Sequence, residues 1–324
     1  MSIANNATDK GKNFMITRRQ ILANTGQLCL LGAFTPTHLR AQITLMQRAI
    51  PKTGEYLPVI GLGTYRTFNV GDDPNELNPL QRVLELFFRH GGTVVDSSPA
   101  YGPSEAAFGY LAERINLPDD LFVATKVRAG SHAEGIRQMD ASAQKMGVEN
   151  IDLMQVHSLA DWKTQLPILK ERKAQGIYRY IGITASRVEL YDDFITIMNN
   201  EPLDFIQINY SVAERQAEER ILPLAMDRGI AVFVNRPFVA GALFSHVQSK
   251  ALPDWATEFD CDSWGQFFLK FVLSHPAVTV ALQATSNPQH LLDNLSAGQG
   301  LLPNTELRQR MVDLIGLTGR PPWT

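Results

Sequence analysis

Short apolar runs alternate with longer amphipathic runs along most of the chain, beginning near residue 50. Short apolar runs bounded by turn residues are typical of buried strands, and apolar residues at helical spacing are typical of the helices that cover them. The predicted strands end near residue 64 and cover residues 93–96, 121–126, 151–155, 180–183, 205–209, 231–234 and 278–282. The predicted helices cover residues 79–89, 104–114, 133–146, 164–175, 187–198, 214–228, 263–274 and 288–296, with an extra helix over 304–316.

This alternation predicts one closed (β/α)8 barrel. The strand–helix units follow one another without a break in composition, and the strands are apolar on both faces, as in a parallel sheet. Glycines stand where helices need a left-handed cap, at Gly91, Gly147, Gly176 and Gly229. The segment PKTGEY predicts a small N-terminal β-hairpin, while residues 235–262 are predicted to be irregular. We therefore expect an α/β fold over residues 49–324, a TIM barrel with an N-terminal β-hairpin and a C-terminal extra helix.

Residues 1–48 are predicted to be a signal or leader and a linker. The stretch TRRQIL places paired arginines before a mildly apolar run, and this resembles a twin-arginine export signal. We expect a periplasmic protein that contacts an export translocase through this leader; a cytoplasmic protein with a basic tail is the alternative. Ala41 follows Leu39 and Arg40 rather than small residues, so an uncleaved leader that tethers the chain to the membrane stays open.

The composition excludes several classes of partner. The 324 residues are 44% hydrophobic and 19% charged, which is ordinary for a globular protein. With a net charge of −3, the protein lacks the excess of positive charge that attracts nucleic acid. The two cysteines, Cys29 and Cys261, do not suggest a disulfide framework, and the histidines lack the spacing of metal ligands. A small molecule is the expected partner, and a monomer is the default expectation.

Four polar side chains follow three consecutive predicted strands. Asp96 and Tyr101 come at and after the second strand, Lys126 at the end of the third, and His157 after the fourth. In a barrel, the residues that follow the strands meet at one mouth. A buried lysine needs a carboxylate partner, and Asp96 on the neighbouring strand is the natural one. Because a nearby ammonium lowers the pKa of a phenol, the set predicts Tyr101 as a tuned proton donor, suited to carbonyl reduction.

These residues also fit a known pattern. Residues 96–102, Asp-Ser-Ser-Pro-Ala-Tyr-Gly, resemble the Asp-x-x-x-x-Tyr-Gly motif of the aldo/keto reductase superfamily, and ATKV, then IDLMQVH, continue the pattern in order. With GLGTY near the start, the resemblance covers essentially residues 49–297. It implies a nicotinamide-dependent carbonyl reductase that uses NADP(H) or NAD(H). In that family Tyr101 would be the general acid, Lys126 and Asp96 would tune it, and His157 would position the substrate carbonyl.

The resemblance implies cofactor contacts as well, with departures from the family pattern. Thr64 ends the first-strand signature, and Gln207 matches the glutamine that holds the nicotinamide carboxamide. Thr184 takes the place of the serine in a Ser-Asn pair, but no asparagine follows it. Asn235 stands where an aromatic residue commonly stacks on the nicotinamide ring. Arg236 follows it, and we interpret its guanidinium as a partner for the cofactor pyrophosphate or an anionic substrate.

After the last predicted strand, ATSNPQHLLDNLSA is similar to the segment that holds the adenosine phosphate in this family. Thr285, Ser286, His290 and Asn294 are the contacts that the resemblance implies, whereas the usual Lys and Arg are missing. Hydroxyls at a helix N-terminus still bind phosphate, but without charge-assisted partners. We therefore expect comparable affinities for NADH and NADPH.

Two other functions fit parts of the pattern. One is a nucleotide-binding sensor or accessory subunit on the same barrel, with little turnover. The other is a barrel lyase or isomerase that uses Lys126 as a Schiff base. The pattern does not identify the carbonyl substrate. Loop aromatics that could form walls of its pocket are Phe68, Trp162, Phe238, Trp255 and Trp323.

Overall fold

The computed structural model of the chain describes residues 44–316. The predicted leader with its arginine pair, Cys29 and Trp323 lie outside the described residues.

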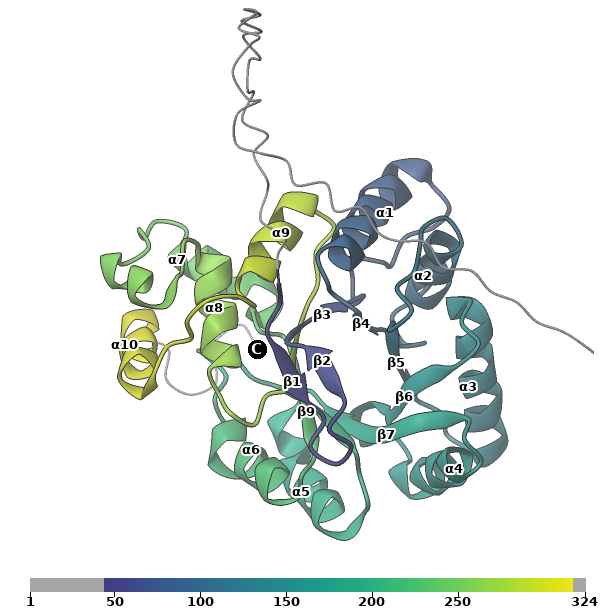
Figure 1. The fold of residues 1–324 in the computed structure, drawn as a ribbon. Helices are drawn as coiled ribbons and strands as arrows, with labels where there is room; N and C mark the ends of the chain where they lie inside the picture. The colour runs from purple at the N-terminus through teal and green to yellow at the C-terminus, as the bar shows by residue number, and fades with distance from the viewer. Residues whose placement is uncertain (1–43, 317–324) are drawn as a thin grey trace, which may run out of the picture. The chain divides into compact units, whose positions relative to one another are not determined.

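Eight parallel strands close into a barrel in the order β10-β3-β4-β5-β6-β7-β8-β9 (Figure 1). The predicted (β/α)8 barrel is therefore confirmed. Each strand pairs in parallel with its neighbours in the sequence, and β10 pairs with β3 to complete the ring. The strands are β3 Ile60–Gly63, β4 Val94–Asp96, β5 Phe122–Val127, β6 Ile151–Val156, β7 Tyr178–Ala185, β8 Phe205–Asn209, β9 Ala231–Asn235 and β10 Val280–Gln283.

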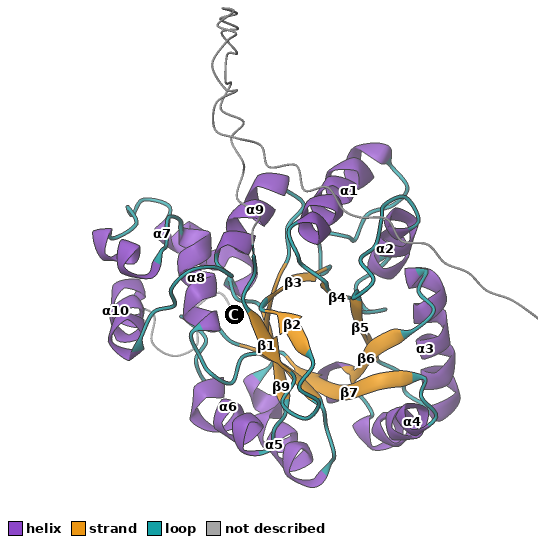
Figure 2. Cartoon of the chain, viewed as in Figure 1, coloured by secondary structure: helices purple, strands orange, loops and turns teal. Residues whose placement is uncertain are grey.

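Helices form a ring outside the strands (Figure 2). The predicted left-handed caps are present: Gly147, with φ of 64°, ends the third helix, and Gly176, with φ of 77°, follows the fourth. The helices are α1 Pro74–Arg89, α2 Ser104–Ala112, α3 His132–Met146, α4 Trp162–Ala174, α5 Tyr191–Asn200, α6 Ala217–Asp227, α7 Ala242–Val247, α8 Trp264–Leu273, α9 Pro288–Ser296 and α10 Thr305–Ile315.

The N-terminal β-hairpin is also confirmed, and it closes one end of the barrel. Strands β1 (Gln47–Ala49) and β2 (Tyr56–Pro58) pair antiparallel. Ile50 and Leu57 of the hairpin join a buried cluster with residues from the beginnings of the barrel strands, such as Val94, Phe122 and Phe205. The carboxyl ends of the strands are at the other end of the barrel, where this fold carries its chemistry.

One predicted helix boundary and one predicted irregular segment were wrong. Helix α1 begins at Pro74 rather than at Pro79, because the Asp73 side chain accepts a hydrogen bond from the amide of Asn75 and caps the helix. Pro79 therefore lies inside the helix. The segment predicted to be irregular contains helix α7 and two short 3-10 turns, Val239–Gly241 and Asp254–Phe259.

Candidate active site

Lys126 and Asp96 form the expected ion pair at the mouth of the barrel. Asp96 ends β4 and pairs in register with Ala124 of β5, so Lys126, two residues further on, points to the same face. Its Nζ lies 2.7 Å from Asp96 Oδ2 and 2.9 Å from Oδ1, and it also donates to the carbonyl oxygen of Ser97 at 2.7 Å. Both side chains are buried. Three oxygen atoms, two of Asp96 and one of Ser97, therefore accept hydrogen bonds from the ammonium.

Tyr101 lies next to this pair. Lys126 Nζ is 5.0 Å from the centre of the Tyr101 ring, and the ring of His157 meets the tyrosine edge-on at 5.7 Å between centroids. Burial raises the pKa of the Tyr101 phenol; the charge of Lys126 lowers this pKa, and Asp96 raises it again. The net direction is upward, opposite to the sequence-based expectation, because desolvation outweighs the lysine. The phenol therefore keeps its proton at neutral pH.

His157 is held as a neutral imidazole. It follows β6 directly, and its Nδ1 lies 3.0 Å from the hydroxyl oxygen of Ser98. Burial lowers the pKa of His157 to about 3, and the charges of Lys126 and Arg128 act in the same direction. The Ser98 oxygen also accepts from the amide of Ala100 at 3.2 Å. In the tautomer in which the Ser98 hydroxyl donates to Nδ1, the proton of the ring is on Nε2, where it can act as a hydrogen-bond donor.

Gln207, predicted to hold the cofactor, faces the ion pair in this structure. Its Nε2 donates to Asp96 Oδ2 at 3.1 Å. Gln155, a residue that the sequence reasoning missed, lies two positions before His157 and donates to Gln207 Oε1 at 3.4 Å and to Asp96 Oδ1 at 3.5 Å. Both glutamines are buried, as are Asp96 and Lys126. Gln155 could have been predicted from the alternation of side chains along β6. A strand directs every second residue to the same face, and this alternation places Gln155 on the face that bears Asp96 and Gln207.

Thr64 and Thr184 lie in this region with their hydroxyls engaged. Thr64 is fully buried and donates to the hydroxyl of Ser97 at 2.8 Å. The Thr184 hydroxyl accepts from the backbone amide of Ser158 at 2.9 Å, directly after His157. The motifs indicated the position of both threonines but not these partners.

Asn235 and Arg236 stand together at the end of β9. Asn235 is the last residue of the strand, and its Oδ1 is buried without a hydrogen-bond partner among the described residues. Arg236 adopts a left-handed backbone conformation with φ of 54°, and its Nη2 lies 3.6 Å from Glu214 Oε1. Their assignment to the cofactor stays a prediction.

The segment after β10 offers hydroxyls and a helix N-terminus. Asn287 caps α9 by accepting from the amide of Gln289. Thr285 is nearly buried and accepts from the amide of Asn287 at 3.0 Å, while Ser286 and His290 are exposed. Asn294 is buried and donates to Gln283 Oε1 at 3.0 Å, so its amide is directed at the barrel strand. These four residues also remain predicted cofactor contacts.

Several candidates for the substrate pocket belong to the core instead. Phe68 is fully buried. Trp255 packs against Phe259 and Phe267 and lies under the guanidinium of Arg310. Tyr65, which the sequence reasoning did not single out, is half exposed and its ring contacts Tyr101 at 4.9 Å between centroids. It is therefore a better candidate than these two aromatics for contact with a substrate.

Cys261 is not placed for chemistry. The thiol is buried, and burial raises its pKa to about 12. A protonated, buried thiol is a poor nucleophile.

Curated relatives share part of the chain. Aldo-keto reductase YhdN of Bacillus subtilis is 28% identical over 214 residues, which cover 60% of this chain and 62% of the relative, less than two thirds of its length. The NADH-specific methylglyoxal reductase of Escherichia coli is 29% identical over 235 residues, 61% of this chain and 68% of that protein.

Solved structures share the fold. The holo form of aldo-keto reductase AKR11C1 from Bacillus halodurans is similar with a TM-score of 0.68 at 20% identity, covering 84% of this chain and 96% of that one. An aldo/keto reductase from Klebsiella pneumoniae, in complex with NADP and acetate, gives a TM-score of 0.69 at 20% identity, with coverage of 82% and 94%. Residues 59–310 match the Aldo/keto reductase family, and the protein accordingly belongs to that family.

Proposed function

We propose that the protein is an oxidoreductase that reduces an aldehyde or ketone to an alcohol, or catalyses the reverse, with NADPH or NADH. The single observation that carries the proposal is the position of Tyr101, a protonated phenol between the buried Lys126 and the neutral His157. The names of relatives agree with it, since one is an NADH-specific methylglyoxal reductase and one neighbour binds NADP.

Each side chain has a role in the proposed reaction. The Tyr101 hydroxyl gives its proton to the carbonyl oxygen. A bound nicotinamide cofactor would supply the hydride that the carbonyl carbon takes up. Lys126 stabilises the phenolate that remains, and Asp96 holds the ammonium in place. The Nε2–H of His157 donates to the same carbonyl oxygen and orients the substrate. Both donors are neutral before the reaction, and the Tyr101 phenolate that remains takes up a proton from solvent before the next turnover.

The barrel mouth has polar atoms that fit a nicotinamide carboxamide. Gln155 Oε1 and Asn235 Oδ1 are buried acceptors without partners among the described residues, and such atoms call for a donor such as an amide NH2. The Thr184 hydroxyl accepts from Ser158 and still has its own hydrogen to donate. With Gln207 and Thr64 beside them, these residues would hold the nicotinamide end.

The adenosine end is proposed to rest on the segment after β10. Thr285, Ser286 and His290 offer hydroxyls and an imidazole at the start of α9, without Lys or Arg. We expect NADPH and NADH to bind with comparable affinity, and a preference above ~100-fold, about 2.7 kcal/mol, would contradict this. Titration of the protein with each nucleotide, followed by intrinsic fluorescence, measures the ratio.

Replacement of Tyr101 by phenylalanine tests the reaction. Turnover of aldehydes with NADPH or NADH should fall by about 10²–10⁴-fold, because the proton donor is lost while the ring remains. Tyr110→Phe, on the exposed face of α2, is the matched control and should retain wild-type activity. If the wild type binds the nucleotide but reduces no carbonyl compound, the protein is instead a nucleotide-binding sensor or accessory subunit. The departures from the family's cofactor pattern, with Asn235 in place of the stacking aromatic residue and no Lys or Arg after β10, favour this second candidate.

We also propose that the protein is exported through its twin-arginine-like leader. The support is the sequence TRRQIL alone. None of the helices within residues 44–316 is long and apolar enough to cross a membrane. Cell fractionation of the full-length chain beside a variant with Arg18→Lys and Arg19→Lys tests export. An unchanged distribution of the variant would remove the argument for export through the twin-arginine-like leader.

A further inference from the structure

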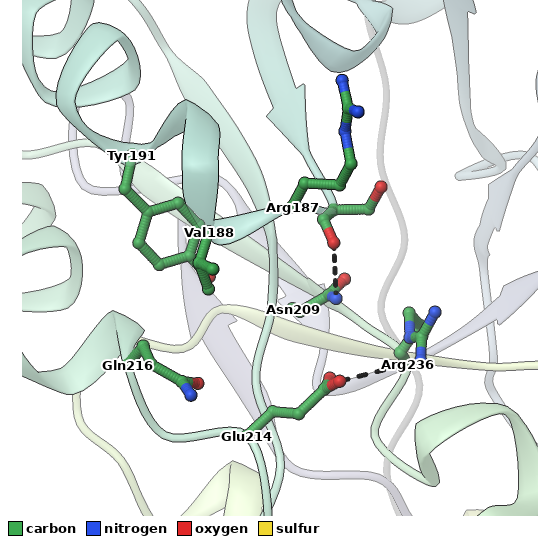
Figure 3. A pocket seen from close by; sticks show the side chains of 8 residues that line it. Arg187, Val188, Tyr191, Asn209, Glu214, Gln216 and Arg236 are labelled. Carbon is green, nitrogen blue, oxygen red and sulfur yellow. Dashed lines mark hydrogen bonds and ion pairs between the residues drawn. The ribbon is translucent and has the colours of Figure 1, made fainter. Parts of the chain in front are cut away.

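Glu105 is the one buried acidic side chain within residues 44–316 that forms no ion pair. Each of the others has a cationic partner: Lys126 for Asp96, Arg179 for Asp152, Lys173 for Asp204 and Arg236 for Glu214. Figure 3 shows the last of these pairs, with the Glu214 carboxylate directed at Arg236. Glu105 is only 1% exposed, so the structure must accommodate this carboxyl group in another way.

Glu105 lies between helix α2 and the outer face of strand β5. Its Oε1 accepts a hydrogen bond of 2.6 Å from the hydroxyl of Thr125, which is fully buried. Thr125 directly precedes Lys126 in β5. Because side chains alternate along a strand, Thr125 faces the surrounding helices while Lys126 faces the interior of the barrel. Glu105 therefore contacts the strand that carries Lys126, from the side opposite to the ammonium.

The surroundings of Glu105 favour the protonated carboxyl group. Its Oε2 is buried and has no hydrogen-bond partner in the described part of the chain. Burial raises the pKa of Glu105, and this effect outweighs the hydrogen bond from Thr125 and the charges of Lys145 and Lys126, which lower the pKa. The first turn of α2 also favours an anion, but the field of a helix end is weaker than the cost of burying an unpaired charge.

Helix α3 provides an acceptor for the hydrogen of a protonated Glu105. The hydroxyl of Ser142 faces the carboxyl group, and it donates its own hydrogen to the carbonyl oxygen of Gln138 at 3.1 Å. Because a hydroxyl has one hydrogen, the Ser142 oxygen in this arrangement can accept from Oε2 but cannot donate to it. An ionised Oε2 would meet a lone pair instead, so this contact also favours the neutral acid.

The turn of α2 that carries Glu105 also holds the backbone of Tyr101. Helix α2 begins at Ser104, and the hydroxyl of this residue donates to the carbonyl oxygen of Tyr101 at 2.7 Å. Ser104 is buried, and Glu105 follows it directly. Contacts therefore run from the strand of Lys126 through Glu105 to Tyr101, whose ring centre lies 5.0 Å from Lys126 Nζ.

We propose that Glu105 is a protonated positioning residue, which fixes the first turn of α2 against β5 and so sets the distance between Tyr101 and Lys126. The inference rests on the proposed reductase function, to which it adds a residue outside the barrel interior. Without this anchor the phenol can move away from the ammonium. Such a displacement lowers the rate of proton transfer, whereas substrate binding, which involves His157, changes little.

Infrared spectroscopy of the full-length chain at neutral pH tests the protonation state without turnover. The wild type should show the C=O band of a buried carboxylic acid, and Glu105→Gln should lack this band. Glu113→Gln, at the exposed C-terminal end of α2, is the matched control and should keep it. If the wild type and Glu105→Gln do not differ in this part of the spectrum, Glu105 is ionised and the proposal is overturned.

Steady-state kinetics test the positioning role. Glu105→Gln keeps an acceptor for Thr125 and a donor for Ser142, so kcat and KM should stay within about threefold of the wild type. Glu105→Leu removes both and should lower kcat by about 10-fold or more, while KM changes less than about threefold. Thr125→Val breaks the same contact more mildly, and its addition to Glu105→Leu should cause no further loss. Equal kcat values for Glu105→Gln and Glu105→Leu would contradict the role.

Hydrogen exchange separates this inference from the proposed function. The Ala107 amide donates to the carbonyl oxygen of Pro103 at 2.9 Å in the first turn of α2. Its exchange should be faster in Glu105→Leu and unchanged in Glu105→Gln. If this pattern and the infrared band are found but the wild type reduces no carbonyl compound, the anchor stands and the reductase proposal fails. If the wild type is an active reductase but the amide exchanges equally in both variants, the positioning role fails alone.

Discussion

The backbone amide of Ser158 donates a hydrogen bond of 2.9 Å to the hydroxyl oxygen of Thr184. This bond ties the loop that begins with His157 to the neighbouring strand β7. Ser158 and Leu159 both have left-handed backbone conformations, with φ of 52° and 55°. Such conformations are unfavourable for a residue like Leu and persist only where surrounding contacts impose them. Thr184 is one of these contacts, so it supports the position of His157 as well as lying in the predicted cofactor site.

Loss of the Thr184 hydroxyl should weaken catalysis through His157. In Thr184→Val the Ser158 amide loses its acceptor, and kcat/KM for carbonyl reduction should fall by about 10-fold or more, the equivalent of one lost hydrogen bond in a catalytic network. Thr184→Ser keeps the hydroxyl and should stay within a few-fold of the wild type. Hydrogen exchange of the Ser158 amide should be faster in the valine variant only. Equal behaviour of the two variants in both measurements would contradict this coupling.

Ser98 should control the tautomer of His157. If Ser98 donates to Nδ1, its removal leaves Nδ1 without a donor, so that the proton can move to Nδ1 and away from the substrate side. Ser98→Ala should therefore lower kcat/KM by about 10-fold, within the range for a misoriented general-acid network. Nitrogen NMR of labelled histidine should show the Nε2–H form in the wild type and a mixture in the variant. Ser296→Ala, on α9, is the control.

The sequence supported the barrel and the ion pair because each depends on a regular pattern. Alternating apolar runs identified every barrel strand, and Asp96 and Lys126 had to meet because their strands are neighbours with a common inward face. The contacts of Ser98 and Gln155 were not predicted, because they depend on the side-chain conformations of residues that belong to different strands. Desolvation raises the pKa of Tyr101 and the charge of Lys126 lowers it. No sequence motif indicates which of the two effects is larger.

Removal of Lys126 alone should destabilise the fold strongly. Lys126→Met leaves the Asp96 carboxylate buried without its cation, which should lower the free energy of unfolding by about 3–5 kcal/mol. The double variant with Asp96→Asn removes the uncompensated charge and should recover most of that loss. Lys170→Met, which breaks a half-exposed pair with Glu201, should cost no more than about 1 kcal/mol. Urea unfolding at neutral pH measures all three, and a double variant as unstable as the single one would contradict the argument.

The neutral, buried His157 should make the protein lose stability as the pH falls. The folded state resists protonation because the pKa of His157 is lowered to about 3, whereas in the unfolded chain the imidazole binds a proton near its ordinary value of 6.5. Between these two values the unfolded state holds more protons, so its population grows as the pH decreases. From pH ~7 to pH ~5 this one residue should lower the free energy of unfolding by up to about 2 kcal/mol.

Replacement of His157 by glutamine removes this contribution and tests its sign. The variant should lose about 2 kcal/mol less than the wild type over the same pH interval, measured from urea unfolding at pH ~7 and pH ~5. His290→Gln, exposed on α9, changes the same residue type outside the site and should follow the wild-type curve. If His157→Gln and the wild type lose equal stability, the imidazole is protonated in the folded protein as readily as in the unfolded one. In that case His157 would take up a proton beside Lys126 near its ordinary pKa of 6.5, and it would act as a neutral Nε2–H donor only above that pH.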